Sequence, residues 1–119
     1  KNNRNGGETM SITMHLYYAG KNGNARRFAE EMEQGGTADL IRAEPGNEGY
    51  AYFVSMDDPE TVLLVDRWKD QASLDAHHAS SMMRTIIDLR KTYDLHLRAE
   101  RLISDDAGIP DSDVRFINE

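Results

Sequence analysis

The order of strand-like and helix-like segments constrains the fold of this chain more than any other feature. Alternating side chains mark strands, whereas apolar residues spaced three and four apart mark helices. The sequence predicts strands at residues 12–18, 50–54, 62–69 and 93–103, and helices at residues 25–33, 37–43, 71–78 and about 80–91. This order, β-α-β-β-α-β, predicts an α+β fold of the ferredoxin-like type, an antiparallel sheet with its helices on one face.

Local signals support several of these boundaries. Asn24 and Asp70 precede predicted helices and are expected to cap them, and Ser80 or Ser81 is expected to cap the last one. The short connection between the strands at residues 50–54 and 62–69 predicts an antiparallel hairpin.

The helices can cover only one face of such a sheet, although the other face also carries apolar residues. A chain of 119 residues is enough for one domain with a thin core. We therefore expect a homodimer in which two sheets pack together. Residues 1–9 are expected to form a flexible lead, residues 10–104 the domain, and residues 105–119 a tail. The apolar end of that tail is expected to pack on the partner subunit as an added short strand.

Charge and composition narrow the classes of function. The formal net charge is −7, which disfavours nucleic acids and anionic membranes as partners. The chain has no cysteine, so disulfides, thiolate metal sites and cysteine nucleophiles are excluded. No apolar run approaches the ~20 residues of a membrane span, and the first residues lack a signal core, so a cytoplasmic protein is expected.

The strand at residues 62–69 carries two candidate site residues on one face. Trp68 is interpreted either as a core aromatic or as a wall on which a flat aromatic substrate stacks. Asp66 shares its parity, so an enclosed carboxylate there must be paired or protonated. A salt bridge from Asp66 to Arg42 or another arginine is one interpretation, and a base or anchor for a substrate hydroxyl is the other.

Histidines offer the best candidates for moving protons near neutral pH. His77 and His78 follow Leu74 by three and four positions, so either can face the core, and the alternative is a surface pair at a helix end. Adjacent histidines on a helix diverge by about 100°, and no carboxylate at convincing spacing joins them, so no metal site is predicted. Tyr50 and Tyr52 share a strand parity and either place a hydroxyl in a cavity or serve sheet packing.

Several runs carry a resemblance to a known family. They are Glu44-Pro45-Gly46, Asp66-Arg67-Trp68-Lys69-Asp70, and the spacing of Leu74, His77 and Ser80. Over roughly residues 12–104 the chain resembles the antibiotic biosynthesis monooxygenase family. That resemblance implies a dimeric α/β barrel and, in several members, oxidation of quinols or polyketide phenols without a cofactor. Met82 stands where many members have a second histidine, which puts a two-histidine proton relay in doubt.

The resulting hypothesis is a homodimeric monooxygenase that needs no cofactor and no metal. Its substrates would be O₂ and a small aromatic, quinol or polyketide-like compound in a pocket between sheet and helices. His77 and Asp66 are the expected catalytic residues, and the expected substrate-binding residues are Trp68, Arg42, Tyr50, Tyr52, His78 and Met82. Glu44 is interpreted as a turn residue held by backbone or by an arginine.

Three alternatives stay open. One is an isomerase or degrader of a small signalling molecule, and another is a dimer that binds a ligand without turnover. Haem degradation is less expected. The resemblance implies that haem-binding relatives use a histidine on the later helix, and residues 81–91 contain none.

Overall fold

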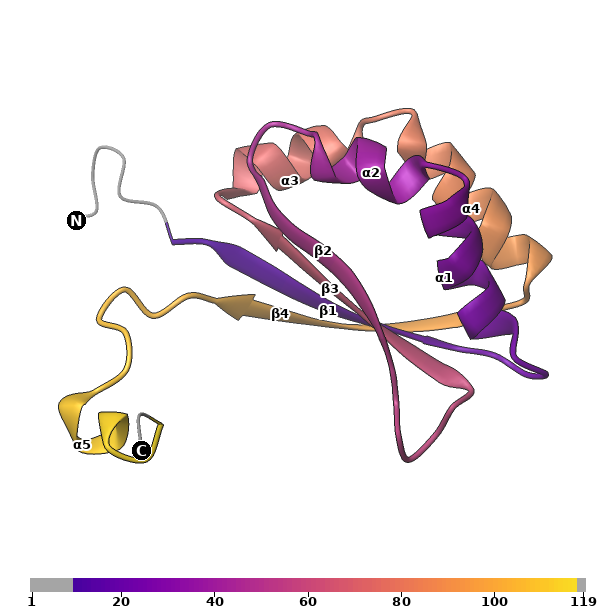
Figure 1. Cartoon of the computed structure of the whole chain (residues 1–119). Helices are drawn as coiled ribbons and strands as arrows, with labels where there is room; N and C mark the ends of the chain where they lie inside the picture. Colours follow the sequence, from indigo (N-terminus) through magenta and orange to yellow (C-terminus); the bar gives the residue numbers. More distant parts are fainter. Residues whose placement is uncertain (1–9, 118–119) are drawn as a thin grey trace.

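The computed structural model describes residues 10–117, so the expected lead at residues 1–9 lies outside the described part. The elements are β1 (Ile12–Ala19), α1 (Asn24–Gln34), α2 (Thr37–Arg42), β2 (Asn47–Val54), β3 (Thr61–Trp68), α3 (Gln71–His78), α4 (Met82–Thr92), β4 (His96–Ile103) and α5 (Asp111–Val114). Figure 1 shows one twisted sheet with α1 to α4 on one face and α5 apart from both layers. The predicted α+β ferredoxin-like fold is confirmed.

The sheet is antiparallel, with strand order β2-β3-β1-β4. The predicted hairpin is the β2–β3 pair, in which Tyr50 lies opposite Asp66. In the neighbouring pair, Leu16 of β1 lies opposite Leu64 of β3. Because side chains alternate along a strand, this register places the even-numbered residues of β1, β2 and β3 on the face beneath the helices.

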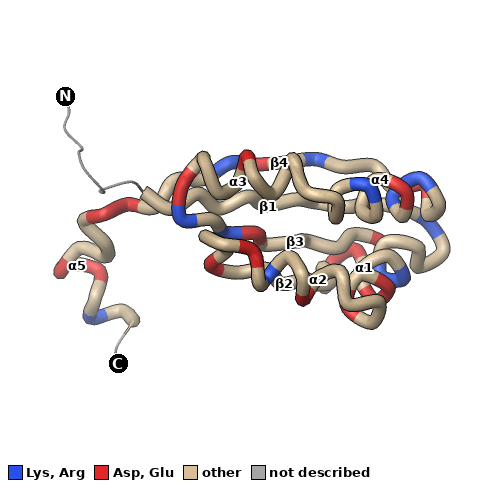
Figure 2. The backbone as a smooth tube through the Cα atoms, turned by 90° about the horizontal axis from the view of Figure 1, so that it is seen from above, with Lys and Arg blue, Asp and Glu red and all other residues tan. Residues whose placement is uncertain are grey.

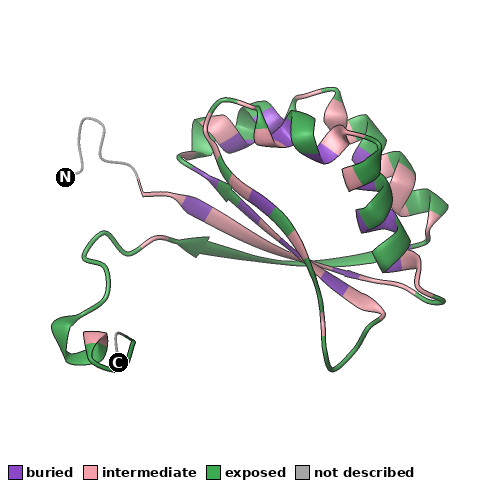
Figure 3. Ribbon diagram, in the orientation of Figure 1, coloured by how far each residue is buried: buried purple, intermediate pink, exposed green. Residues whose placement is uncertain are grey.

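The helices cover that face with a stripe of apolar residues. Phe28 and Met32 of α1 and Ile41 of α2 are fully buried, and the first two are spaced by one helical turn. Figure 3 shows the buried positions concentrated where the helices face the sheet, while the outer surface of the helices is exposed. The core is therefore a single layer between sheet and helices.

The helix starts partly match the predictions. Asp70 caps α3 as expected, because its Oδ1 accepts a hydrogen bond of 2.8 Å from the Ser73 N–H. Asn24 does not cap α1, since the cap residue is Gly23 with φ +78°. The Gly23 N–H donates instead to Glu60 Oε1 at 2.8 Å. Ser81 precedes α4 without making a side-chain cap bond.

The last strand begins later than predicted. α4 continues to Thr92, and Asp94 adopts a left-handed φ of +52°, which turns the chain before β4 begins at His96. All residues of β4 are exposed, including Leu97 and Ile103. This edge of the sheet therefore lacks cover within residues 10–117.

The face of the sheet away from the helices is also apolar. Phe53 has 53% of its surface exposed, and Leu63 lies opposite it on β3. Tyr17 lies opposite Leu63 on β1. Arg98 covers the Tyr17 ring at 4.0 Å. A face of this kind supports the predicted homodimer, which stays a prediction.

The tail is helical where a strand was expected, so that prediction is wrong. Asp111–Val114 form the single helical turn α5. Pro110 precedes the turn, and two aspartates occupy its start, where negative charge favours a helix. Phe116 beyond it is 71% exposed. Packing of this segment on a partner subunit stays a prediction.

Charges are distributed over both layers. Figure 2 shows acidic and basic positions interspersed along the strands and helices. Within residues 10–117, every helix is too short or too polar to cross a membrane.

Candidate functional site

A small cavity lies between the helix-facing side of the sheet and helices α3 and α4. Its volume is about 150 Å³. It draws residues from all four strands, because the alternation on each strand sends one side chain in two beneath the helices. The lining residues are Leu16, Tyr18, Tyr50, Leu64, Asp66, His77, His78, Met83, Ile86, Arg90 and Leu97.

His77 enters this cavity from α3 and is only 4% exposed. It faces inward because it follows buried Leu74 by three positions, on the same side of the helix. Its imidazole stacks on the indole of Trp68, with ring centroids 4.8 Å apart and planes at 26°. Its Nδ1 lies 2.7 Å from Oε1 of Glu44. The histidine is thus held from two sides.

The turn that carries Glu44 is packed tightly on α3. Gly46 has φ +85°, and a Cβ at this position would lie 2.1 Å from the Ser73 hydroxyl oxygen. The Gly46 carbonyl also accepts a 2.9 Å hydrogen bond from the Lys69 N–H. Ser73 and His77 are one helical turn apart, so the turn contacts α3 at both positions. The interpretation that backbone or an arginine holds the Glu44 side chain is wrong, because His77 does.

Asp66 projects into the cavity from β3 and is 3% exposed. Burial raises the pKa of its carboxyl to about 7, and the charge of Glu44 contributes to that rise. The Trp68 indole N–H lies near the carboxyl and offsets part of this rise in pKa. The contact between the two groups does not meet hydrogen-bond geometry. Oδ1 of Asp66 has no hydrogen-bond partner among residues 10–117. The carboxyl is therefore partly protonated near neutral pH.

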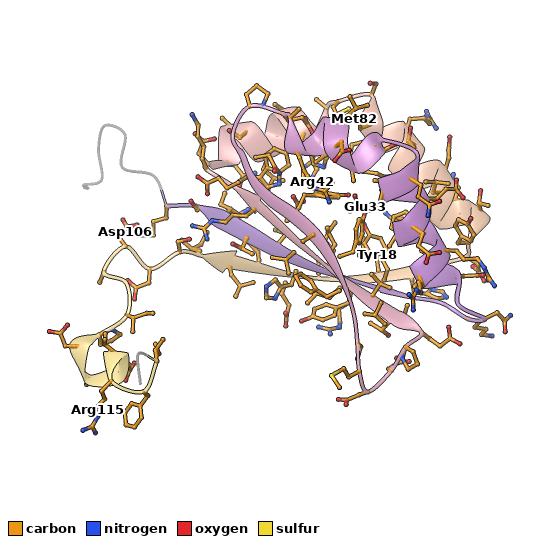
Figure 4. The ribbon with its side chains drawn as sticks, viewed as in Figure 1. Tyr18, Glu33, Arg42, Met82, Asp106 and Arg115 are labelled. Carbon is orange, nitrogen blue, oxygen red and sulfur yellow. The ribbon has the colours of Figure 1, made fainter. Side chains whose placement is uncertain are left out.

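Arg42 does not pair with Asp66, which corrects one prediction. Its guanidinium binds Glu33 and Asp39, and its Nε donates to the Tyr50 carbonyl at 2.9 Å. Figure 4 shows Arg42 and Glu33 beside each other between the sheet and the helix layer. Arg42 does not line the cavity, so it supports the β2 backbone.

The two predicted tyrosines lie in different places. Tyr50 lines the cavity, whereas Tyr52 lines a groove beside α1. Their hydroxyl oxygens lie 2.9 Å apart. Burial raises the pKa of both phenols, and it raises the pKa of Tyr18, a further lining residue, to about 12. All three hydroxyls are therefore neutral and can donate hydrogen bonds.

Trp68 and the helical candidates are only partly where the sequence predicted them. Trp68 is fully buried and does not line the cavity, and the His77 ring covers one of its faces. His78 is an exposed residue at the cavity margin. Met83, not Met82, lines the cavity, whereas Met82 is half-buried and packs against the core elsewhere.

Sequence reasoning missed Arg90, Tyr18 and Met83 as site residues. Arg90 lines the cavity with a buried Nε that has no hydrogen-bond partner within residues 10–117. Met83, Ile86 and Arg90 follow one another at spacings of three and four on α4, so the helical period would have placed the arginine beside the apolar stripe. Arg90 is close enough to Tyr18 to lower the pKa of its phenol.

The cavity thus combines a histidine, a poorly solvated carboxyl and an arginine with apolar walls. Within the described residues, no three histidine, aspartate or glutamate side chains are grouped so that they could hold a metal ion. Such an arrangement can accept a proton and bind a small ring that carries oxygen atoms.

Known proteins share the fold of this chain, and a family model matches its sequence. The chain matches the antibiotic biosynthesis monooxygenase (ABM) family over residues 11–89. No curated protein matches it at a significant level. A Deinococcus radiodurans structure assigned to this family is 17% identical, with a TM-score of 0.72 over 83% of this chain and 97% of the other. A cofactor-independent oxygenase from Streptomyces nogalater is 11% identical, with a TM-score of 0.68 over 82% and 95%.

These likenesses show a shared fold, and the family match covers more than half of the sequence. A conserved protein from Methanosarcina mazei has the same architecture, with 19% identity and a TM-score of 0.71 over 83% of this chain and 97% of the other. The chain belongs to the antibiotic biosynthesis monooxygenase family.

Proposed function

We propose that this protein is a cofactor-independent monooxygenase that hydroxylates a single-ring hydroquinone or a similar phenol. The observation that carries the proposal is the position of His77. It lines a small cavity with apolar walls, and Asp66 and Arg90 line the same cavity. The family match and the structural likeness to a cofactor-independent oxygenase support the same class of reaction.

The size of the cavity selects among aromatic substrates. Its volume is about 150 Å³. A cavity of roughly 150 Å³ in another protein accepts one benzene molecule. One ring with two hydroxyl groups therefore matches this space, whereas a compound with several fused rings would extend out of the cavity past exposed Leu97.

The reaction begins with a proton transfer. A neutral His77 imidazole accepts the proton of one substrate hydroxyl, which leaves an electron-rich phenolate. The guanidinium of Arg90 favours that anion through its charge, and the apolar walls exclude water that would otherwise solvate it.

The anion then reacts with O₂. A bond forms between the ring carbon next to the phenolate and one oxygen atom, and the other oxygen takes up a proton to give a hydroperoxide. The O–O bond breaks as this carbon loses its hydrogen, which releases water and leaves a new carbonyl. Hydroquinone and O₂ thus give hydroxyquinone and water, and the substrate supplies all four electrons.

Asp66 and Tyr50 suit the binding of the second substrate oxygen. The raised pKa of Asp66 leaves a protonated fraction near neutral pH, and that form can donate a hydrogen bond. The Tyr50 hydroxyl is neutral and lines the same cavity. Trp68 contributes indirectly, because it stacks on the base and not on the ligand.

Oxygen uptake by the purified protein tests this proposal. Single-ring hydroquinones are expected to give uptake above their autoxidation, and fused multi-ring phenols much less. His77→Gln should lower kcat roughly 100-fold, because it removes the base. His96→Gln is the matched control, since this histidine lies outside the cavity at the start of β4.

Other outcomes would change the assignment. Equal uptake by the His77→Gln variant and the unmodified protein would exclude His77 as the base. Substrate loss without oxygen uptake would favour an isomerase or a degrader of a small molecule. Tight binding without turnover would favour a ligand-binding dimer.

A further inference from the structure

The contact between Glu44 and His77 links two distant parts of the chain inside the molecule. Oε1 of Glu44 lies 2.7 Å from Nδ1 of His77, and the side chains are only 13% and 5% exposed. Thirty-three positions separate the two residues in sequence. A contact this short and this buried is a charge-assisted hydrogen bond or an ion pair, and either form is much stronger than its solvated equivalent.

The chemistry of the two groups decides where the proton lies. An ionised carboxylate only accepts hydrogen bonds, so the nitrogen that faces it must carry hydrogen. In the neutral imidazole the hydrogen is therefore on Nδ1, and the lone pair is on Nε2. Nε2 is then the only basic nitrogen of this ring.

The surrounding backbone is built to keep this contact in place. Gly46 packs against Ser73 with no room for a side chain, and its carbonyl binds the Lys69 N–H. Because Ser73 and His77 lie one turn apart on α3, the same packing that docks the turn directs Glu44 toward His77. Trp68 supports the opposite side of the imidazole by stacking.

From this geometry we propose that Glu44 is a positioning residue, which holds His77 as the Nδ1–H tautomer and so makes Nε2 the base of the reaction. The kinetic part of this inference rests on the proposed function. The tautomer itself does not.

The charged groups around His77 set the pH at which it can act. Glu44 faces it from the turn before β2, His78 from its own helix, and Asp66 and Arg90 line the same cavity from β3 and α4. Burial lowers the pKa of His77, its neighbour His78 lowers it further, and the Glu44 carboxylate counteracts both. The imidazole is therefore neutral near pH 7, while Glu44 keeps it from becoming too weak a base.

The first test needs no substrate. Nitrogen NMR of the imidazole in the unmodified protein should show Nδ1 protonated and Nε2 unprotonated near pH 7.5. The opposite tautomer would overturn the proposal, whether or not any variant folds.

The second test changes the charge while the size of the side chain stays the same. Glu44→Gln should lower the pKa of His77 by roughly one unit, since an opposite charge at this distance shifts a pKa by about that much or more. Glu30→Gln is the matched control, because it removes the same charge from the surface of α1, where Glu30 pairs with Arg26. The stacked Trp68, the only tryptophan, gives an optical signal for the same titration. An unchanged His77 titration in Glu44→Gln would overturn the proposal.

Kinetics then separate positioning from mere stability. Glu44→Gln should lower kcat roughly 10- to 100-fold with KM changed less than about threefold, and it should move the acid limb of the pH profile to lower pH. Glu44→Asp, which keeps the charge, should restore that limb. An acid limb that lies at the same pH in Glu44→Gln, Glu44→Asp and the unmodified protein would overturn the kinetic role of Glu44. Absence of oxygenase activity together with the expected tautomer would instead reject the proposed function and leave the Glu44–His77 pair intact.

Discussion

The indole of Trp68 and the imidazole of His77 lie nearly parallel, with ring centroids 4.8 Å apart. A tryptophan at this position suggested either a core aromatic or a surface for stacking a substrate, and in the structure it is buried and stacks on a histidine. The histidine, and not the tryptophan, reaches the cavity. Because the contact buries both rings, a change at Trp68 is expected to act on the geometry of His77 before it acts on a ligand.

Stability should depend on pH through Asp66. Its pKa is raised from an ordinary value of 3.8 to about 7. Between these pH values the unfolded chain loses the proton while the folded protein keeps it. The contribution of Asp66 to the free energy of unfolding is therefore fully present below about pH 4, is lost as the pH rises toward 7, and stays absent above that.

Asp66→Asn removes this titration. At pH 8 it should raise the free energy of unfolding by about 2 kcal/mol. This is about half of the roughly 4 kcal/mol that a shift from 3.8 to about 7 represents at ~1.4 kcal/mol per pKa unit. At pH 4 it should give no gain. Urea denaturation at both pH values measures the difference, in which the separate titration of His77 cancels. A gain that is the same at both pH values would contradict the buried-acid explanation.

Gly46→Ala should destabilise the protein by roughly 1–3 kcal/mol, because it combines a positive φ with a clash against Ser73. Gly49→Ala is the matched control, since Gly49 has no positive φ and its added Cβ would meet the nearest atom at 3.8 Å. Thermal unfolding of the two variants compares them directly. If both changes cost the same, the close approach of the turn to α3 is not what requires glycine.

The uncovered face of the sheet predicts how the protein assembles. Phe53→Asp places a charge in that face and should convert the expected dimer to monomer, as measured by sedimentation. Leu40→Asp is the matched control, because Leu40 is 60% exposed on α2, on the helix side. Dimers that persist in Phe53→Asp, or monomers in the unmodified protein, would contradict assembly through this face.

The sequence predicted most of the fold because periodicity is a local property. Alternation on residues 12–18 already placed Leu16 and Tyr18 on the buried face, and Asp70 marked the start of α3. Two predictions failed where backbone conformation decided the outcome. Gly23, and not Asn24, is the cap residue before α1, and the left-handed conformation of Asp94 delays the start of β4. The predicted strand in the tail is not observed, because a proline and two aspartates at the start of α5 favour a helical turn.

The site was less accessible to sequence reasoning, because its residues meet only through the register of the strands and the docking of helices. His77, Asp66 and Tyr50 were predicted and do share the cavity. Arg42 was expected beside Asp66, but two acidic residues closer in sequence, Glu33 and Asp39, bind it instead. The helical period places Arg90 beside the apolar stripe of α4, but only the packing of α4 over the sheet brings it to the cavity.

What the sequence by itself determined is therefore the order of elements and the side of each strand that faces inward, since both follow from the spacing of apolar residues along the chain. Only the tertiary structure decided which polar groups are partners. It joined Glu44 to His77 across 33 positions and left Oδ1 of Asp66 without a hydrogen-bond partner among the described residues. Hydrogen bonds and charge pairs act over a few ångströms, so they depend on distances that exist only after the helices have packed on the sheet.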